Sequence, residues 1–244
     1  MSTELRSLTS LKSGGTLIAS KTNRTPAWQA PPKAHRRVRI VCIADTHELH
    51  RDLSLPDGDL LIHAGDFTFW NHASKIQDFN NWFGELPHRY KVVIPANHDR
   101  AFNQDPRFRE MITNAVLLIN EGVRLCGLNK WGSPVTCDDD VYGNTKRDER
   151  PRLYASIPAD THILVTHGPP YGILDREPGS IHRQGCTELR LAVMRLRPRL
   201  HGFGHVHAGY GTCHTERTLF VNAALLGWAG DIENMPIVLD NTSW

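Results

Sequence analysis

Residues 38–47 read Val38-Arg-Ile-Val-Cys-Ile-Ala-Asp45-Thr-His47, a short apolar run followed at once by an acidic residue and a histidine. The β-branched residues of this run predict a buried strand, with Asp45 and His47 just beyond its carboxyl end. Apolar runs of the same kind, each of which predicts a further strand, occupy residues 59–63, 91–94, 162–166 and 200–203.

Two segments between these runs have the periodicity of amphipathic helices. In residues 72–86 the apolar side chains recur at the spacing of one helical face, and residues 187–197 repeat the pattern before Pro198 ends it. Alternating strands and helices predict an α/β fold with parallel strands. After residue 208, short strands at 217–222 and 237–240 are separated by glycine turns, which predicts an antiparallel end to the fold.

Polar residues follow each of the predicted strands directly. Because ligands bind beyond the carboxyl ends of strands in open α/β sheets, we expect these segments to converge on one rim. For any single segment a turn or a helix cap would be a sufficient explanation, but caps have no need of histidine. Besides Asp45-Thr-His47, the segments are Gly65-Asp66, Asn97-His98-Asp99, His167-Gly168 and Gly204-His205-Val-His207.

The residue types in these segments select the chemistry. Carboxylates, an amide carbonyl and imidazoles form an oxygen and nitrogen donor set without thiolate, which suits manganese, iron or zinc better than a structural cysteine-rich zinc site. The candidate ligands are too many for one tetrahedral ion. They suffice for two ions that share a bridging carboxylate, an arrangement that clamps the attacking and leaving oxygens of a phosphoryl group.

In their order along the chain, these segments resemble the five sequence blocks of the calcineurin-like metallophosphoesterase superfamily, which are D-x-H, G-D, G-N-H-[DE], a histidine before glycine, and G-H-x-H. The sequences around Asp66 and around His205 and His207 are similar to the metallophosphoesterase domain-containing (MPPED-type) branch. The resemblance extends over residues 38 to 240.

The resemblance implies a fold and an activity. The fold would be a four-layer αββα sandwich, in which two mixed β-sheets pack face to face and helices flank them. The activity would be that of a metal-dependent phosphoesterase, a phosphodiesterase acting on small or cyclic nucleotides. The cofactors would be two divalent metal ions, manganese first, with iron or zinc as alternatives.

The resemblance also implies a role for each residue. A hydroxide held by the two metals would attack the phosphorus. His98 would stabilise the transition state or protonate the leaving oxygen, and Asp99 would orient His98. The metal ligands would be Asp45, His47 and His207 for one ion, Asn97, His167 and His205 for the other, and Asp66 as the bridge.

One position departs from the pattern of the family. Ala96 stands where the third block of the family begins with glycine. If the backbone there has a positive φ, alanine costs about 1 kcal/mol or shifts the turn. We therefore expect Ala96 to displace Asn97 and to weaken the second metal site.

The charged residues are unevenly distributed. Residues 1–39 contain eight basic side chains and one acidic one, and the rest of the chain contains 20 basic and 25 acidic ones. We expect residues 1–35, which lack any sustained period, to form a flexible basic leader before a metallophosphoesterase domain at 36–244. The acidic balance of that domain argues against a specific nucleic-acid surface, and hence against a DNA nuclease. No apolar run is long enough to span a membrane.

The compartment and two further functions follow from weaker signals. Five cysteines without a C-x-x-C pair, and no secretory signal, favour the cytoplasm, with organelle targeting by the leader as the alternative. A protein Ser/Thr phosphatase would share the metal blocks but would usually carry an additional arginine-containing block that is not found here. A scaffold with the same fold and little activity is the other alternative, favoured by Ala96 and opposed by the intact His205.

Overall fold

The computed structural model describes residues 38–69, 72–137 and 146–240, and the fold is given for these residues. The predicted basic leader at 1–35 lies outside them, as do residues 36 and 37 at the start of the predicted domain. Within the described residues, no helix is both long enough and apolar enough to cross a bilayer.

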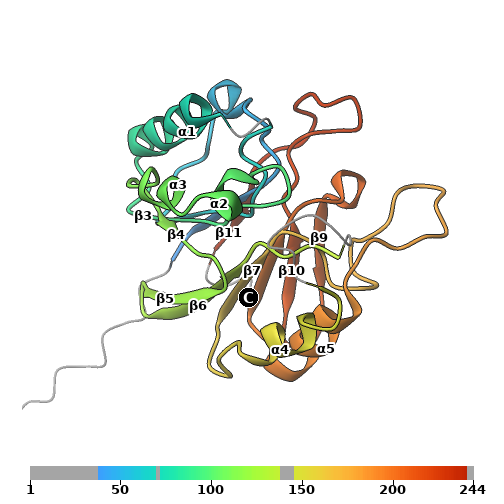
Figure 1. Ribbon diagram of the computed structural model, residues 1–244. Coiled ribbons are helices and arrows are strands. Elements are labelled where there is room, and N and C mark those ends of the chain that lie inside the picture. Colours follow the sequence, from blue (N-terminus) through green and yellow to red (C-terminus); the bar gives the residue numbers. More distant parts are fainter. Residues whose placement is uncertain (1–37, 70–71, 138–145, 241–244) are drawn as a thin grey trace, which may run out of the picture. The chain divides into compact units, whose positions relative to one another are not determined.

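The strands form two mixed sheets (Figure 1). In the first sheet the neighbouring strands pair in parallel except at one edge, where β11 runs antiparallel to β1. Its order is β11 (Ile237–Leu239), β1 (Ile40–Ile43), β2 (Leu60–His63), β3 (Tyr90–Val93) and β4 (Val116–Leu117). The second sheet has the order β5 (Glu121–Leu125), β6 (Leu128–Ser133), β7 (Ile163–Thr166), β8 (Leu200–Phe203), β10 (Leu219–Asn222) and β9 (Gly211–His214).

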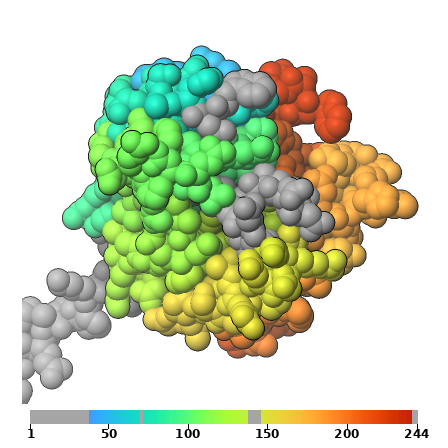
Figure 2. Space-filling view, in the orientation of Figure 1, coloured from blue at the N-terminus to red at the C-terminus, as the bar shows by residue number. Residues whose placement is uncertain are grey.

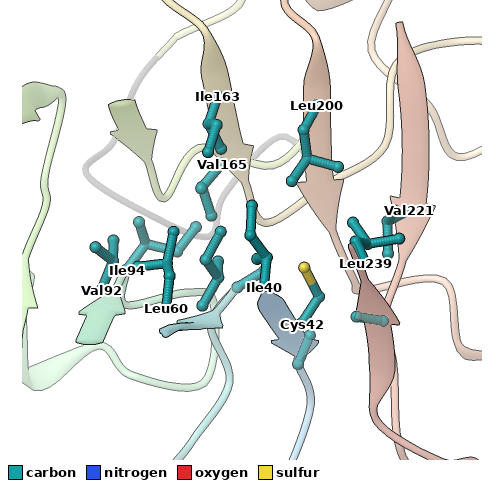
Figure 3. Packing of buried hydrophobic residues seen from close by; sticks show 14 of the residues in the cluster. Ile40, Cys42, Leu60, Val92, Ile94, Ile163, Val165, Leu200, Val221 and Leu239 are labelled. Atoms are coloured by element: carbon teal, nitrogen blue, oxygen red, sulfur yellow. The ribbon is translucent and has the colours of Figure 1, made fainter. Parts of the chain in front are cut away.

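The two sheets pack face to face through an apolar layer (Figure 3). Ile40 and Cys42 of β1 point into this layer, where Val165 and Leu200 of the second sheet meet them. The alternate residues of β1, such as Val41, belong instead to the cluster on the opposite face of the first sheet. Strands buried on both faces explain why the predicted strands are continuous apolar runs rather than alternating ones.

Helices cover the outer face of each sheet, which completes the four-layer sandwich. On the first sheet, α1 (Ala73–Glu85) buries the predicted apolar face, including Phe79 and Phe83. In Figure 2 the cyan and green segments that include α1 to α3 gather above the yellow segment of α4. The other helices are α2 (Ala101–Gln104) and α3 (Arg107–Glu110), then α4 (Arg150–Ala155) and α5 (Thr187–Leu196) on the second sheet, and the short 3₁₀ turns η1 (His50–Asp52) and η2 (His207–Gly209).

The predicted α/β fold is confirmed, with one part of the topology corrected. The antiparallel end is present where β9 pairs with β10 and where β11 pairs with β1, but β10 pairs in parallel with β8. The sequence analysis did not predict the hairpin of β5 and β6. Cys126 and Gly127 turn this hairpin with φ angles of 53° and 76°, the conformation of a tight two-residue hairpin turn.

Candidate metal centre

The predicted site residues come together where β1, β2 and β3 of the first sheet end beside β7 and β8 of the second. Contacts between side chains and the backbone join the two sheets at this rim. His167 Nδ1, after β7, lies 2.8 Å from the carbonyl oxygen of Ala64, after β2. The amide of His205, after β8, donates to Asp45 Oδ2 at 3.0 Å. The expected convergence on one rim is therefore present.

A first group of possible ligands contains Asp45, His47 and His207, each of which offers a donor atom within 4.8 Å of the others. Asp45 is fully buried, and its Oδ1 lies 3.5 Å from Nε2 of His207. Burial opposes ionisation of Asp45, but the hydrogen bond from His207 and the charge of His167 hold the pKa of Asp45 below its ordinary value. The carboxylate is thus kept in the form that binds a cation.

A second group contains Asp66, His167 and His205, again with donor atoms within 4.8 Å. Nε2 of His167 lies 3.1 Å from Oδ2 of Asp66. Burial lowers the pKa of His167, but the Asp66 carboxylate outweighs it and raises that pKa to about 9. The same Oδ2 lies 3.9 Å from Nε2 of His47, in the first group. Asp66 therefore stands between the two groups, where the bridging ligand is predicted.

Two of the histidines are held in the orientation that metal ligands require. Nδ1 of His167 faces the Ala64 carbonyl, and Nδ1 of His207 lies 3.3 Å from the carbonyl oxygen of Gly227. A carbonyl only accepts hydrogen bonds, so Nδ1 carries the hydrogen in both rings. Nε2, which faces the carboxylates, is then the atom that gives up its proton when the ring binds a cation, and the hydrogen on Nδ1 keeps the ring oriented as in other ligating histidines.

Buried donor atoms without hydrogen-bond partners test whether two metal ions fit here. Within the described part of the chain these atoms include Oδ1 of Asn97 and Nδ1 of His47. An unpaired buried polar atom is costly, and metal coordination would remove that cost. The oxygen and nitrogen donors, with one carboxylate between two groups, fit a pair of divalent ions.

The backbone is unusual at several of these positions. Left-handed φ angles are uncommon for residues other than glycine and cluster at functional sites. Gly204 also approaches the site closely, because a Cβ on this residue would lie 2.0 Å from Asp45 Oδ2. The left-handed site residues are Asp45 (φ 55°), His47 (φ 38°), Asp66 (φ 56°) and His205 (φ 70°).

Among the hydrogen bonds of the described residues, none joins the Asp99 carboxylate to the His98 ring that it was predicted to orient. The two oxygens of that carboxylate instead accept hydrogen bonds from the backbone amides of Asp66, Thr68 and Ala96, at 2.8–2.9 Å, and from the Thr68 hydroxyl at 2.7 Å. Burial and the Asp66 charge raise the pKa of Asp99 to about 8, against the hydrogen bonds from Thr68 and Ala96. Asp99 thus joins the turn after β2 to the turn after β3 and is a positioning residue for Asp66.

His98 lies beside the first group rather than within it. Its amide donates to Asp66 Oδ1 at 2.8 Å, and its ring meets the edge of His47 at a centroid distance of 4.8 Å. Phe69 stacks on the His98 ring at 5.1 Å and also meets His47 at 5.5 Å, so the three rings form one cluster. A side chain so placed can reach a phosphoryl group bound between the two ligand groups.

Ala96 does not have the backbone strain that its substitution for glycine led us to expect. Its φ is not positive, and its amide donates to Asp99 at 2.9 Å. Its methyl group occupies space beside Gly65, where a Cβ on residue 65 would be 2.5 Å away. The physical reason for expecting a displaced Asn97 is therefore absent.

A cavity of about 370 Å³ opens beside the ligand groups and is lined by Asp66, His98 and His207. Phe69 and Trp228 also line it, with exposed fractions of 40% and 90%. Neither residue is among the predicted site residues, although Phe69 follows the Gly65-Asp66 block closely.

Comparisons with known proteins agree with this geometry. Residues 38–209 match the family described as calcineurin-like phosphoesterase. The chain is 36% identical over 244 aligned residues to metallophosphoesterase domain-containing protein 1 of Homo sapiens, covering 88% of this chain and 74% of the relative. It is 34% identical to UPF0046 protein K07C11.7 of Caenorhabditis elegans, over 82% of this chain and 74% of the relative. One crystal structure with 17% identity matches with a TM-score of 0.67 over 84% of this chain and 96% of its own.

Proposed function

The chain belongs to the calcineurin-like phosphoesterase family, whose members are metal-dependent phosphoester hydrolases, and we propose that its substrates are small or cyclic nucleotide phosphodiesters. The observation that carries the proposal is the position of Asp66, 3.1 Å from His167 and 3.9 Å from His47. One carboxylate thus serves two ligand groups beside an open cavity. This supports a dinuclear centre, for which manganese is our first choice and iron or zinc the alternatives.

The family resemblance implies a ligand assignment, which the two groups of donor atoms support. We assign Asp45, His47 and His207 to one ion, and Asn97, His167 and His205 to the other, with Asp66 shared. When bound, two divalent ions supply Lewis acidity towards the phosphoryl oxygens and lower the pKa of water. The chain contributes the positions of the ligands, through the Ala64 and Gly227 carbonyls and the Asp99 carboxylate.

His98 is the residue to which we assign proton transfer. Its backbone is fixed by Asp66, and its ring contacts both His47 and Phe69 at the cavity. From there the imidazole can donate a hydrogen bond to a phosphoryl oxygen and a proton to the leaving oxygen. Proton transfer by a positioned side chain raises the rate by about 10²- to 10⁴-fold.

The aromatic residues at the cavity support a nucleotide over a phosphoprotein. Phe69 and the largely exposed Trp228 line the cavity together with the proposed ligands. A flat, exposed indole beside a phosphate site suits stacking by a nucleobase, which contributes about 1–3 kcal/mol per base.

A substrate panel with Mn²⁺ tests the proposal. It contains a phosphomonoester, a linear phosphodiester, a 2′,3′-cyclic nucleotide and a 3′,5′-cyclic nucleotide, assayed with the wild type, His98→Ala and the exposed control His182→Ala. We expect hydrolysis of the diesters by the wild type and His182→Ala, a loss of about 10²-fold or more in His98→Ala, and none after chelation of the metal.

The other outcomes distinguish the alternatives. Preference for the phosphomonoester would contradict the diester assignment and favour a protein Ser/Thr phosphatase. Wild-type rates that equal those of both His98→Ala and the chelated protein on every substrate would contradict enzyme activity and favour a scaffold with the same fold.

A further inference from the structure

A second cluster of possible ligands lies outside the proposed dinuclear centre. Cys137, Cys186 and Glu188 each offer a donor atom within 4.8 Å of the others. Cys137 belongs to the loop after β6, whereas Cys186 and Glu188 form the N-terminal turn of α5. These segments meet on the outer side of the second sheet, where α4 and α5 lie side by side (Figure 1).

The distances fit the coordination of one tetrahedral ion. Sγ of Cys186 and Oε2 of Glu188 are 3.4 Å apart. Zinc–sulfur bonds of about 2.3 Å and zinc–oxygen bonds of about 2.1 Å, at the tetrahedral angle, place a sulfur and an oxygen ligand about 3.6 Å apart. The two donor atoms therefore stand close to the spacing that a zinc ion requires. The Glu188 side chain is 20% exposed, so a cation can reach the cluster.

Polar and charged groups surround the two sulfurs. The amide of Leu189 in α5 donates to Cys186 Sγ at 3.4 Å. A hydrogen bond from Cys137 lowers the pKa of Cys186, and this outweighs the effect of burial. The hydrogen bond to Cys186 and burial raise the pKa of Cys137, whereas the charge of the buried Arg150 guanidinium opposes this rise. Two thiolates and a carboxylate around a divalent cation have a net charge of −1, which this guanidinium balances.

Tyr154 of α4 is buried beside the cluster. Its side chain is 1% exposed, and its hydroxyl interacts with the sulfur of Cys186. Burial and the neighbouring Cys186 and Cys137 sulfurs raise the pKa of this hydroxyl, so it lies close to both. It can donate a hydrogen bond to a water or anion that fills the fourth coordination position.

We propose that Cys137, Cys186 and Glu188 form a metal site, separate from the dinuclear centre, that binds one thiophilic divalent cation such as Zn²⁺. Binding would displace up to two thiol protons and form two metal–sulfur bonds and one metal–oxygen bond. The ion would tie the loop after β6 to the N-terminus of α5. The proposal does not depend on the proposed phosphodiesterase activity, because none of its ligands belongs to that site.

Cobalt spectroscopy of the full chain tests this site directly. Thiolate ligands give Co²⁺ an intense charge-transfer absorption in the near ultraviolet, whereas the Asp, Asn and His donors of the dinuclear centre do not. The reduced chain is titrated anaerobically with Co²⁺, and then with Zn²⁺ in competition. We expect a charge-transfer band that saturates at one ion per chain and that Zn²⁺ abolishes.

Matched variants assign the band to its ligands. Cys137→Ser and Cys186→Ser should each lose most of the band, whereas Cys213→Ser, which changes an exposed cysteine of β9, should keep it. Glu188→Gln keeps both sulfurs and should bind Co²⁺ about tenfold more weakly or worse, since it removes a charged ligand. Circular dichroism identifies any variant that fails to fold, and the wild-type titration and Glu188→Gln then decide.

Three results would overturn the proposal. The first is a folded wild type without the charge-transfer band. The second is a band that persists unchanged in both folded cysteine variants. The third is a Cys137–Cys186 disulfide, found by mass spectrometry in chain kept under the reducing conditions of the titration.

Discussion

Substituting Gly204 tests whether the approach of the backbone to Asp45 sets the position of the metal ligands. The Cβ of an alanine here would lie 2.0 Å from Asp45 Oδ2 and 2.6 Å from the Cβ of Ala44. The clash is purely steric, because the φ of Gly204 is not in the left-handed region. Gly202, two residues earlier on β8, is the matched control, since a Cβ there has no neighbour within 4 Å.

The size of the effect follows from these distances. Cβ atoms in proteins essentially keep at least 3.0 Å from such neighbours, so Asp45 must retreat by about 1 Å. Ala44 directly follows β1 and is fully buried, so it cannot move aside. Misplacing a reacting group by about 1 Å costs about 10²-fold in rate, and overpacking a core costs about 1–3 kcal/mol of stability.

Two assays together measure this effect. Calorimetric titration of Mn²⁺ should show weakened binding in Gly204→Ala, and kcat for a model phosphodiester should fall by about 10²-fold, whereas Gly202→Ala should match the wild type in both. A folded Gly204→Ala variant with wild-type Mn²⁺ affinity and turnover would refute the assignment of Asp45 as a ligand held by this contact.

Three other substitutions test separate features. Ala96→Gly should leave turnover unchanged and lower the free energy of unfolding by about 1 kcal/mol, because the Ala96 methyl fills the space beside Gly65. A rise in kcat or Mn²⁺ affinity would show instead that the methyl strains the site. Trp228→Ala should raise KM for a nucleotide about tenfold by loss of stacking and leave KM for a base-free diester unchanged; equal changes for both would exclude a base contact. Burial lowers the pKa of His201 to about 3, below the ordinary value of about 6.5, so the unfolded state takes up the proton first and stability falls as the pH falls through 6.5. Between pH 7 and 5 this residue should lower the free energy of unfolding by about 2 kcal/mol. Urea unfolding of metal-free His201→Gln should lack that part of the pH dependence. The same slope of unfolding free energy against pH in the two proteins would contradict this role of His201.

The sequence predicted the rim well because strand ends and polar blocks are adjacent in the chain. The apolar run before Asp45 and the apolar run before His167 each predict a strand and also locate its carboxyl end. The contacts made by Asp99 could not be predicted in this way. They depend on how the turn after β2 lies against the turn after β3, which is a matter of tertiary packing.

Other features were missed for related reasons. The β5–β6 hairpin has a short turn at Cys126 and Gly127 and carries exposed residues on β5, so its apolar pattern is weak. Cys137 and Cys186 are far apart in the chain and lack the spacing of a known metal motif. Their proximity arises from the docking of α5 near the end of β6.

Each of the two ligand groups at the rim draws side chains from both sheets. Asp45 and His47 leave the first sheet and meet His207 from the second, and Asp66 likewise meets His167 and His205. A folding intermediate with one sheet formed would therefore hold neither ion firmly. Metal binding is then coupled to docking of the sheets. Each bound ion stabilises the folded chain, in which the sheets are docked, relative to forms in which they are not, and the stabilisation grows with the logarithm of the metal concentration. Metal supply would thus influence how long the folded chain persists, as well as how fast it turns over substrate.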